Sequence, residues 1–426
     1  MKRRTIIIIF SVIATILTAE CLVYVYVRSL ISLFNNHLLN NLFQIGYWIV
    51  MPSFIVALFI TWKKYYSSQN PAFSGTSFKI VGLFVLVYMP KIFLAAILVL
   101  NQCIVWIYKL LLLAINSARH TSAFSLNEKP FNLIPIIGLC LSVIAFVIIL
   151  FGITLGRFRF RLSRINIAFE KLPNNFHGFK LIQISDLHTG SVSRNISRFI
   201  KVANTINSER PDIIFFTGDI VNEFAGELEG WENFFGLLNA RYAKFSILGN
   251  HDYGDYFPWK SPEEKAANTK KIIEFETRMG FRVLLNESAQ VKVDGHEITI
   301  MGVENWGLTM FRRYGRLEDA LKSTNNEAFK ILLSHDPSHW DAEVSGRTNI
   351  DLTLSGHTHG FQFGIRTRWF RWSPVKKLYP RWEGLHKTGA QYLYVNTGLG
   401  YIGFPGRIGI PPEIAVITLS AGSSEQ

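Results

Sequence analysis

Four long apolar runs fill the first third of the chain, and they constrain its fold more than any other feature. They cover residues 5–27, 42–62, 78 to about 101, and 133–155. Each run is long enough to cross about 30 Å of hydrocarbon as a helix. The first is longer than the apolar core of a cleavable signal peptide, and Glu20-Cys21 is an unsuitable cleavage site. We therefore predict an uncleaved, four-helix transmembrane region over residues 1–156.

The stretch after the third run stays apolar from residue 103 to 115, so it is either a tilted extension of that helix or an interfacial helix. The three cysteines, Cys21, Cys103 and Cys140, also lie within apolar stretches. No Cys-x-x-Cys pair occurs, so we expect neither a disulfide framework nor a thiolate zinc site. Free, buried thiols are the expectation.

Cations predict the orientation of these helices, because the short cytoplasmic loops of membrane proteins are enriched in Lys and Arg. With four crossings, one side receives Lys2, Arg3, Arg4, Lys63, Lys64, Lys79, Arg157, Arg159, Arg161 and Arg164. The opposite loops carry Arg28, Arg119 and Lys129, with Lys109 near the boundary. We therefore expect a multi-pass protein of the inner (cell) membrane whose C-terminal domain is cytoplasmic.

Two opposite charges, Glu20 and Lys91, lie inside the first and third apolar runs, where an unpaired charge is costly. Counted from the cytoplasmic end at about 1.5 Å per residue, they lie at similar depths. We expect an ion pair that fastens these two helices. Alternatively, each charge snorkels to the interface or meets its own polar partner, such as Asn101 or Gln102. A further alternative is that Glu20 and Lys91 mark a substrate path.

The chain of 426 residues is 49% hydrophobic with a net charge of +13, but after residue 156 it has the mixed composition of a soluble domain. We expect this domain over residues 157–420 and a disordered polar tail over 421–426. The first strand is expected at 165–169, with the basic segment 157–164 either a membrane-facing collar or part of that strand. Helices are predicted over 195–208, 231–238 and 263–279, and a hairpin over 281–303 turns at Asp294-Gly295.

Five apolar strands of this domain end in Asp, Asn or His. The clusters that follow them are Ser185-Asp186-Leu187-His188, Thr217-Gly218-Asp219, Gly249-Asn250-His251-Asp252, Ser334-His335-Asp336-Pro337 and Ser355-Gly356-His357-Thr358-His359-Gly360. Each cluster alone also fits an ordinary turn. Ligands of α/β sheets collect at strand ends, so five such clusters at the same structural position predict one shared site.

The residue types in these clusters suit metal binding. Residues i and i+2 of a strand face the same way, so Asp186 and His188 can converge on one ion. Two imidazoles on one tight turn, His357 and His359, can point to different ions, and Asp219 is placed to bridge them. Carboxylate, amide and imidazole ligands without cysteine suit Mn, Fe, Zn or similar divalent ions.

The third cluster adds a neutral ligand and a candidate acid. Asn250 offers an amide oxygen to a metal. His251 is predicted to act in the second sphere as an acid, with Asp252 fixing its tautomer.

In this order, the motifs closely resemble those of the calcineurin-like metallophosphoesterases over about residues 181–360, and the membrane region resembles that of bacterial transmembrane members. The resemblance implies an α/β (α+β) domain of two packed mixed β-sheets flanked by helices. It implies two divalent ions, the first held by Asp186, His188 and His359, the second by Asn250, His335 and His357, with Asp219 bridging. His251 would donate a hydrogen bond or proton to the phosphate or leaving oxygen. One departure is Phe361, where many relatives carry glycine before the glutamine that is Gln362 here.

These features predict a membrane-bound, binuclear metal phosphoesterase that hydrolyses a phosphate ester or pyrophosphate bond. Two ions about 3.5–4 Å apart lower the pKa of a bridging water and hold the phosphoryl oxygens for in-line attack. A membrane-tethered nucleotide phosphodiesterase or nuclease is one alternative. A non-catalytic membrane receptor or scaffold is another, which the complete ligand set disfavours.

A basic and aromatic stretch, residues 366–382, follows the last cluster and is expected near the mouth of the site. Its members are Arg366, Arg368, Trp369, Phe370, Arg371, Trp372, Lys376, Lys377, Arg381 and Trp382. Cations with tryptophans suit a membrane interface and anionic headgroups, but also stacked bases and phosphates, and the alternative is a solvated loop whose tryptophans pack on the domain. We favour contact with membrane lipids and a lipid-linked or other phosphorylated small-molecule substrate, and disfavour nucleic acid.

Overall fold

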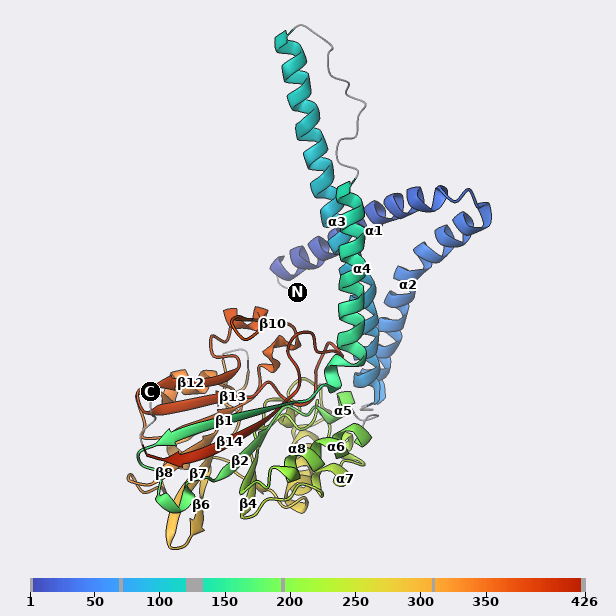
Figure 1. Cartoon of the computed structure of the whole chain (residues 1–426). Helices are drawn as coiled ribbons and strands as arrows, with labels where there is room; N and C mark the ends of the chain where they lie inside the picture. The colour runs from blue at the N-terminus through green and yellow to red at the C-terminus, as the bar shows by residue number, and fades with distance from the viewer. Residues whose placement is uncertain (1–2, 69–71, 120–132, 193–195, 309–310, 423–426) are drawn as a thin grey trace. The chain divides into compact units, whose positions relative to one another are not determined.

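The computed structural model describes residues 3–68, 72–119, 133–192, 196–308 and 311–422. The chain divides into two compact units, Met1–Ile60 with Ile80–Phe151, and Thr61–Lys79 with Gly152–Gln426. The first is helical and the second holds the β-sheets (Figure 1). Each unit is described below by itself.

Four long helices supply the first unit: α1 (Arg3–Ser32), α2 (His37–Ser68), α3 (Ala72–Arg119) and α4 (Leu133–Thr154). All four are long and apolar enough to cross a membrane, as the apolar runs predicted. α3 is continuous over 48 residues, about 72 Å at the usual helical rise. Residues 103–115 therefore continue the third helix and do not form a separate interfacial one.

The expected ion pair between the first and third helices is present. Lys91 Nζ lies 3.0 Å from both carboxylate oxygens of Glu20, whose side chain is 2% exposed. Tyr47 donates a hydrogen bond of 2.9 Å to the backbone oxygen of Glu20, and its ring lies 4.2 Å from Lys91 Nζ. A third helix, α2, thus contacts both members of the ion pair. The three cysteines are free but lie on exposed helix faces, where burial was expected, because apolar helix faces point outward to lipid.

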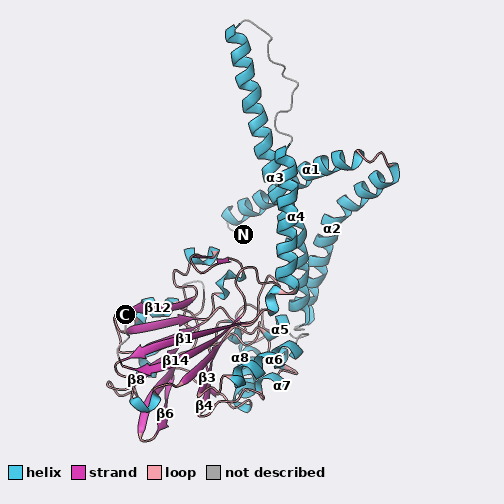
Figure 2. Cartoon of the chain, viewed as in Figure 1, coloured by secondary structure: helices cyan, strands magenta, loops and turns pink. Residues whose placement is uncertain are grey.

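The second unit is built on two six-stranded mixed sheets in the described part of the chain (Figure 2). The first has the order β1-β14-β2-β3-β4-β5 and the second β12-β13-β9-β8-β7-β6. The strands of the first are β1 (Arg161–Phe169), β14 (Glu413–Ala421), β2 (Lys180–Ile184), β3 (Ile213–Phe216), β4 (Ala243–Ser246) and β5 (Arg282–Val283). Those of the second are β12 (Gly384–Thr388), β13 (Gln391–Val395), β9 (Leu352–Ser355), β8 (Phe329–Leu333), β7 (His296–Gly302) and β6 (Glu287–Val293).

The sheets pack face to face around one apolar core, to which both contribute, for example Leu181 and Phe215 from the first and Ile300 and Ile331 from the second. β3 is apolar throughout and buried on both faces, as parallel strands covered by helices are. β6 alternates exposed and buried residues, which marks one solvent face.

Helices cover the outer faces of both sheets. α6 (Ile196–Ser208), α7 (Glu232–Phe235) and α8 (Pro262–Arg278) share a core with the outer face of the first sheet (Figure 2), while α9 (Leu317–Leu321) packs on the second. α6 buries Phe199, Val202, Ala203 and Ile206, the spacing of one helical face. The short α5 (Thr189–Val192) follows β2, and β10 (Ile365–Arg366) pairs with β11 (Arg371–Trp372) in a small separate hairpin.

Three element boundaries differ from those predicted. β1 begins at Arg161, before the expected 165, because Arg161 and Arg164 pair with Glu413 and Glu209 and so have partners within the domain. α7 is shorter than the predicted 231–238. Ala421 of the expected tail ends β14, and residues 423–426 lie outside the described residues. Lys2 and Lys129 of the orientation prediction lie outside them as well.

The end of α2 belongs to the second unit. The ring of Tyr65 lies 6.1 Å from that of Phe224 and 5.6 Å from that of Phe257. Thr61–Lys79, which lies inside the predicted region 1–156 and carries three of its cytoplasmic cations, is part of the sheet-containing unit.

Candidate metal centre

Residues from all five strand ends meet at one place. β2, β3 and β4 are parallel neighbours in the first sheet, and β8 and β9 are parallel neighbours in the second, so their carboxyl ends point to the same edge. Two groups of potential ligands form there, with the atoms of each group within 4.8 Å of one another. The first group is Asp186, His188 and His359, and the second is Asp219, His335 and His357.

Asp219 links the two groups. Its Oδ2 lies 3.1 Å from Nε2 of His335 in one group and 3.7 Å from Nε2 of His188 in the other. Within the first group, Nε2 of His188 lies 3.1 Å from Nε2 of His359, which in turn lies 3.2 Å from Asp186 Oδ1. Ring nitrogens and carboxylate oxygens that converge this closely are a donor set for cations.

Asn250 completes the arrangement. Its Oδ1 is buried and has no hydrogen-bond partner among the described residues, whereas its amide nitrogen donates 2.8 Å to the hydroxyl of Tyr256. A buried unpaired oxygen is costly, and a metal ion would satisfy it. The donors present therefore fit divalent ions of the Mn, Fe or Zn type.

Hydrogen-bond contacts of the ring nitrogens with neighbouring groups orient the imidazoles. His188 Nδ1 lies 3.2 Å from the carbonyl oxygen of Val221, and His335 Nδ1 lies 2.7 Å from that of Thr217. Such contacts set the tautomer and leave the other nitrogen for a metal. His357 lies with Nδ1 3.3 Å from His335 and with Nε2 2.9 Å from the Tyr379 hydroxyl.

The backbone around the cluster is strained. Asp186, His188, Asp219, His357 and His359 all have positive φ, between 49° and 69°, a region that non-glycine residues seldom adopt. Strain of this kind collects at functional sites.

Two glycines are required by close packing. A Cβ at Gly249 would lie 2.2 Å from Asp219 Oδ1, and one at Gly356 would lie 2.3 Å from Asp186 Oδ2. The glycine that precedes Asn250 and the one that precedes His357 therefore let carboxylates approach the backbone.

The expected contact between Asp252 and His251 is wrong. Asp252 instead accepts hydrogen bonds from the backbone of Gly249, Asp219, Ile220 and Val221, and so braces the loop that carries Asp219. His251 Nδ1 lies 2.8 Å from the carbonyl oxygen of Asn222. The physical reason is that the two residues are adjacent on one 3-10 turn, and adjacent helical residues do not face each other.

The electrostatics favour positive charge at the centre. Burial raises the pKa of Asp186, but the imidazoles of His359 and His335 outweigh it and leave the pKa below its ordinary value. Burial lowers the pKa of His335, but the carboxylate of Asp219 outweighs it and raises the pKa to about 10. Burial lowers the pKa of both His188 and His251. A cation beside Asp219 is thus stabilised even in this buried place.

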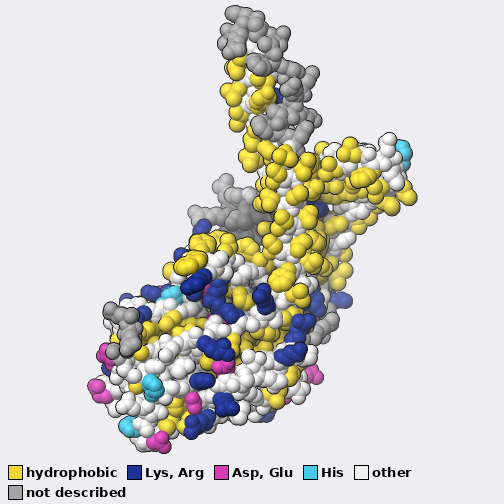
Figure 3. Space-filling view, in the orientation of Figure 1, with side chains coloured by type: hydrophobic (Ala, Val, Ile, Leu, Met, Phe, Trp, Pro, Cys, Tyr) yellow, Lys and Arg dark blue, Asp and Glu magenta, His cyan; other side chains and the backbone are white. Residues whose placement is uncertain are grey.

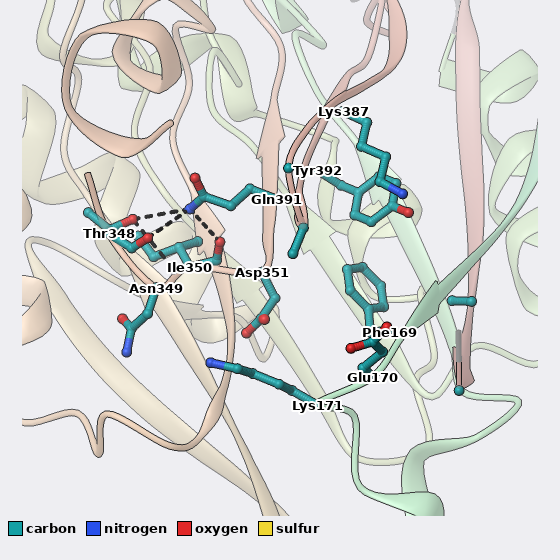
Figure 4. A pocket seen from close by; sticks show the side chains of 14 residues that line it. Phe169, Glu170, Lys171, Thr348, Asn349, Ile350, Asp351, Lys387, Gln391 and Tyr392 are labelled. Atoms are coloured by element: carbon teal, nitrogen blue, oxygen red, sulfur yellow. Dashed lines mark hydrogen bonds between the residues drawn. The ribbon is translucent and has the colours of Figure 1, made fainter. Parts of the chain in front are cut away.

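A cavity of about 370 Å³ opens over the cluster. Asp219, Asn250, His251, His357 and His359 form its floor, and its walls are mostly apolar, with Phe311, Phe361, Val375, Ile402 and Phe404. A cavity of about 440 Å³ lies elsewhere, at the amino end of β9, and is lined by Lys171, Asp351 and Gln391 among others (Figure 4). In it, Gln391 is occupied by bonds to Thr348 and Ile350, and it contains none of the clustered ligands.

Three positioning residues escaped prediction. Asp336 accepts from the Tyr379 hydroxyl at 3.0 Å and lies 3.5 Å from His357 Nε2, and the buried Arg407 lies 3.3 Å from His359 Nδ1. Asp336 directly follows a predicted ligand in the sequence, which was a usable signal. Tyr379 and Arg407 lie in loops far along the chain and carry no local pattern.

Comparison with known proteins finds a family match over the segment that carries these residues. Residues 179–361 match the family described as calcineurin-like phosphoesterase. The uncharacterized metallophosphoesterase YkuE of Bacillus subtilis is 32% identical over 257 residues, which are 59% of this chain and 82% of that protein. A transmembrane protein with metallophosphoesterase domain from Danio rerio is 30% identical to this chain. The match covers 60% of this chain and 56% of that protein, which is about half of its length.

An uncharacterized metallophosphoesterase of Campylobacter jejuni is 25% identical over 97% of this chain and 99% of its own length. That match includes the apolar helices. On the match of its sheet-containing unit and the identity to its bacterial relative, the chain belongs to the calcineurin-like metallophosphoesterases.

Proposed function

We propose that this protein is a membrane-bound hydrolase that cleaves a phosphate ester or phosphoanhydride bond with two divalent metal ions. Family membership makes it a metal-dependent phosphoesterase, and the pair of ions and the kind of substrate are the proposal. It rests above all on Asp219, whose single Oδ2 atom is within 3.7 Å of an imidazole nitrogen of each ligand group.

The ligands divide between two ions. Asp186, His188 and His359 would hold the first, Asn250, His335 and His357 the second, and Asp219 would serve both. When bound, the ions would lower the pKa of a water molecule and neutralise phosphoryl oxygens.

His251 is the chain's own candidate for proton transfer. Its Nδ1 is engaged by the Asn222 carbonyl, while the residue lines the cavity floor. Its Nε2 would therefore donate a hydrogen bond or proton to the phosphate or leaving oxygen.

The apolar walls of the cavity support a lipid-linked substrate. Phe361 and Phe404 stand over a floor of charged and polar ligands, an arrangement suited to a phosphate that carries an apolar group. A nucleotide phosphodiesterase or nuclease is supported less, because Arg366 and Arg371 are engaged by Glu383, and Arg381 by Asp341. A non-catalytic scaffold would have no need of a complete ligand set.

The distribution of cations supports a cytoplasmic site in the cell membrane. The described cations Arg3, Arg4, Lys63, Lys64 and Lys79 fall on one side if all four helices cross. Reporter fusions at the C-terminus test this: a reporter that folds only outside the cytoplasm should stay inactive.

Metal-dependent hydrolysis by the full chain is the test of the function. Purified in detergent, the protein should hydrolyse bis-p-nitrophenyl phosphate with added manganese, lose activity in EDTA and regain it when metal returns. A sample that binds metal but hydrolyses no phosphoester would contradict the proposal. A panel of lipid pyrophosphates, nucleotide-linked lipids and single-stranded DNA then separates the substrate classes.

A further inference from the structure

The hairpin formed by β10 and β11, residues 365–372, presents bulky apolar side chains to the outside. Its strands pair Ile365 with Trp372 and Arg366 with Arg371. The turn is ordered, since the Thr367 hydroxyl accepts hydrogen bonds from the backbone of Phe370 and Trp369. At its tip, Trp369 is 86% exposed and Phe370 54%. Such exposure of large aromatic side chains marks a surface that meets a partner.

Charge on the hairpin is divided between base and tip. At the base, the buried carboxylate of Glu383 lies 3.3 Å from Arg366 and 3.6 Å from Arg371, so both cations share one acidic partner. At the tip, Arg368 lies over the ring of Trp369 at 4.9 Å and has no acidic partner among the described residues. A cation beside exposed aromatic rings suits anionic headgroups at a membrane interface.

The base of the hairpin lies close to where the chain leaves its last apolar helix. Phe363 forms a β-bridge with Ile408. A Cβ added to Gly152, near the end of α4, would lie 2.4 Å from Ile408, and Arg407 donates its backbone N–H to the oxygen of Gly152 at 3.1 Å. Ile408, which pairs with Phe363 two residues before the hairpin, thus contacts Gly152 near the end of a candidate membrane span.

Exposed apolar residues also join the hairpin to the cavity. Phe361, which lines the cavity, is 59% exposed, and Phe363 between it and the hairpin is 43% exposed. Figure 3 shows hydrophobic side chains together with Lys and Arg over the region of β10.

We propose that the β10–β11 hairpin inserts its tip into the interface of an anionic lipid bilayer and that the apolar surface behind it guides a lipid-linked substrate to the cavity. The guiding role rests on the proposed function. Insertion of the tip does not, because it depends only on the exposed aromatics, on Arg368, which lacks an acidic partner in the described part of the chain, and on the neighbouring end of α4.

Insertion is tested on the full chain in nanodiscs of phosphatidylcholine and phosphatidylglycerol. Cys21, Cys103 and Cys140 are replaced by Ser, and a single cysteine at the tip, Trp369→Cys, carries an environment-sensitive NBD label. Asp294→Cys is the matched control, since it lies in the turn between β6 and β7, at the strand ends away from the metal centre. Doxyl-labelled lipids should quench the label at position 369 and not at 294. Equal, weak quenching at both would overturn insertion.

Guiding is tested with two substrates that share a leaving group, bis-p-nitrophenyl phosphate and hexadecyl p-nitrophenyl phosphate. The double variant Trp369→Ala/Phe370→Ala should lower turnover of the hexadecyl substrate about tenfold, equivalent to about 1.4 kcal/mol, and leave the other unchanged. Leu237→Ala, which removes an exposed apolar residue elsewhere, should change neither. An equal effect on both substrates, or none, would overturn guiding. If the unaltered protein hydrolyses neither, the proposed function fails and the quenching result stands alone.

Discussion

One carboxylate, Asp219, contacts both ligand groups and the candidate acid at the metal centre. The sequence pattern around it does not predict all of these contacts. Its Oδ2 faces imidazoles of both groups, and its Oδ1 accepts the backbone N–H of His251 at 2.9 Å. It therefore positions both the ligands and the candidate acid, and among the described residues it is the one carboxylate that lies within 4 Å of imidazole nitrogens of both groups.

Asp219→Asn should release metal from both positions and lower hydrolysis of bis-p-nitrophenyl phosphate by at least about 100-fold, since even outer contacts of metal sites are worth 10–100-fold. The change keeps the shape of the side chain but removes its charge. Metal analysis of the purified protein, beside the turnover assay, gives the measurement. Asp294→Asn, in an exposed turn, is the control. Full metal content in Asp219→Asn would mean that this residue is no shared ligand.

His251→Asn should behave differently. The imidazole is held by Asn222 and is no member of either ligand group, so the variant should keep its metal. Loss of a proton donor costs about 10²–10⁴-fold in rate, and turnover of bis-p-nitrophenyl phosphate should fall within that range. Unchanged turnover at full metal content would remove His251 from the chemistry.

Strands and helices were predictable where burial decided the pattern of apolar residues. The apolar runs before Asp186, Asp219 and His335 predicted β2, β3 and β8, because buried parallel strands need apolar side chains on both faces. Side-chain directions after the strands were not predictable. The positive φ of His357 and His359 and the turn that separates Asp252 from His251 arise from long-range packing.

Helix α8 shows the same limit within one element. Its start was predictable, since Ser261 caps the helix by accepting from the Glu264 backbone and Pro262 takes the first turn. Its many charges are typical of a solvated helix, yet Ile272, Phe275 and Glu276 are buried on one face. A carboxyl group in an apolar face is indistinguishable, in sequence, from one that faces water.

Glu276→Gln should therefore make the protein more stable at neutral pH. Burial raises the pKa of Glu276 well above its ordinary value. Between pH 4.5 and that raised pKa, the unfolded chain loses a proton that the folded chain keeps, so the unfolding free energy falls as pH rises, by up to about 1.4 kcal/mol per pH unit. Gln at this position does not titrate, so the variant does not lose unfolding free energy in this way as pH rises.

The measurement is the melting temperature of each protein across pH 5–8. The variant should gain over the unaltered protein as pH rises, and the two should converge toward pH 5. Glu274→Gln is the control, because Glu274 lies on the same helix with its side chain 52% exposed. A parallel pair of curves for Glu276→Gln would show that the carboxyl group is already ionised in the folded state.

At the scale of the whole molecule, four apolar helices and a sheet-containing unit with the metal centre follow from composition and motif order alone. Composition did not reveal how the chain is shared between the units, because Thr61–Lys79 lies inside the predicted region 1–156 and yet belongs with the sheets. Packing of Tyr65 against Phe224 and Phe257 depends on aromatic residues that lie 159 and 192 positions further along the chain.

The pair of Glu20 and Lys91 should hold the helical unit together. Glu20→Gln leaves Lys91 without its counter-charge in an apolar bundle, and removal of one partner of a buried pair costs about 3 kcal/mol. The melting temperature of the full chain in detergent should fall, and Lys91→Met should lower it as well. The double variant should recover most of the loss, because neither charge then remains buried alone. Cys21→Ser, on the adjacent exposed position of α1, should change nothing. If the losses of the two single variants simply add in the double variant, the charges act independently and the 3.0 Å contact between them contributes nothing to the fold.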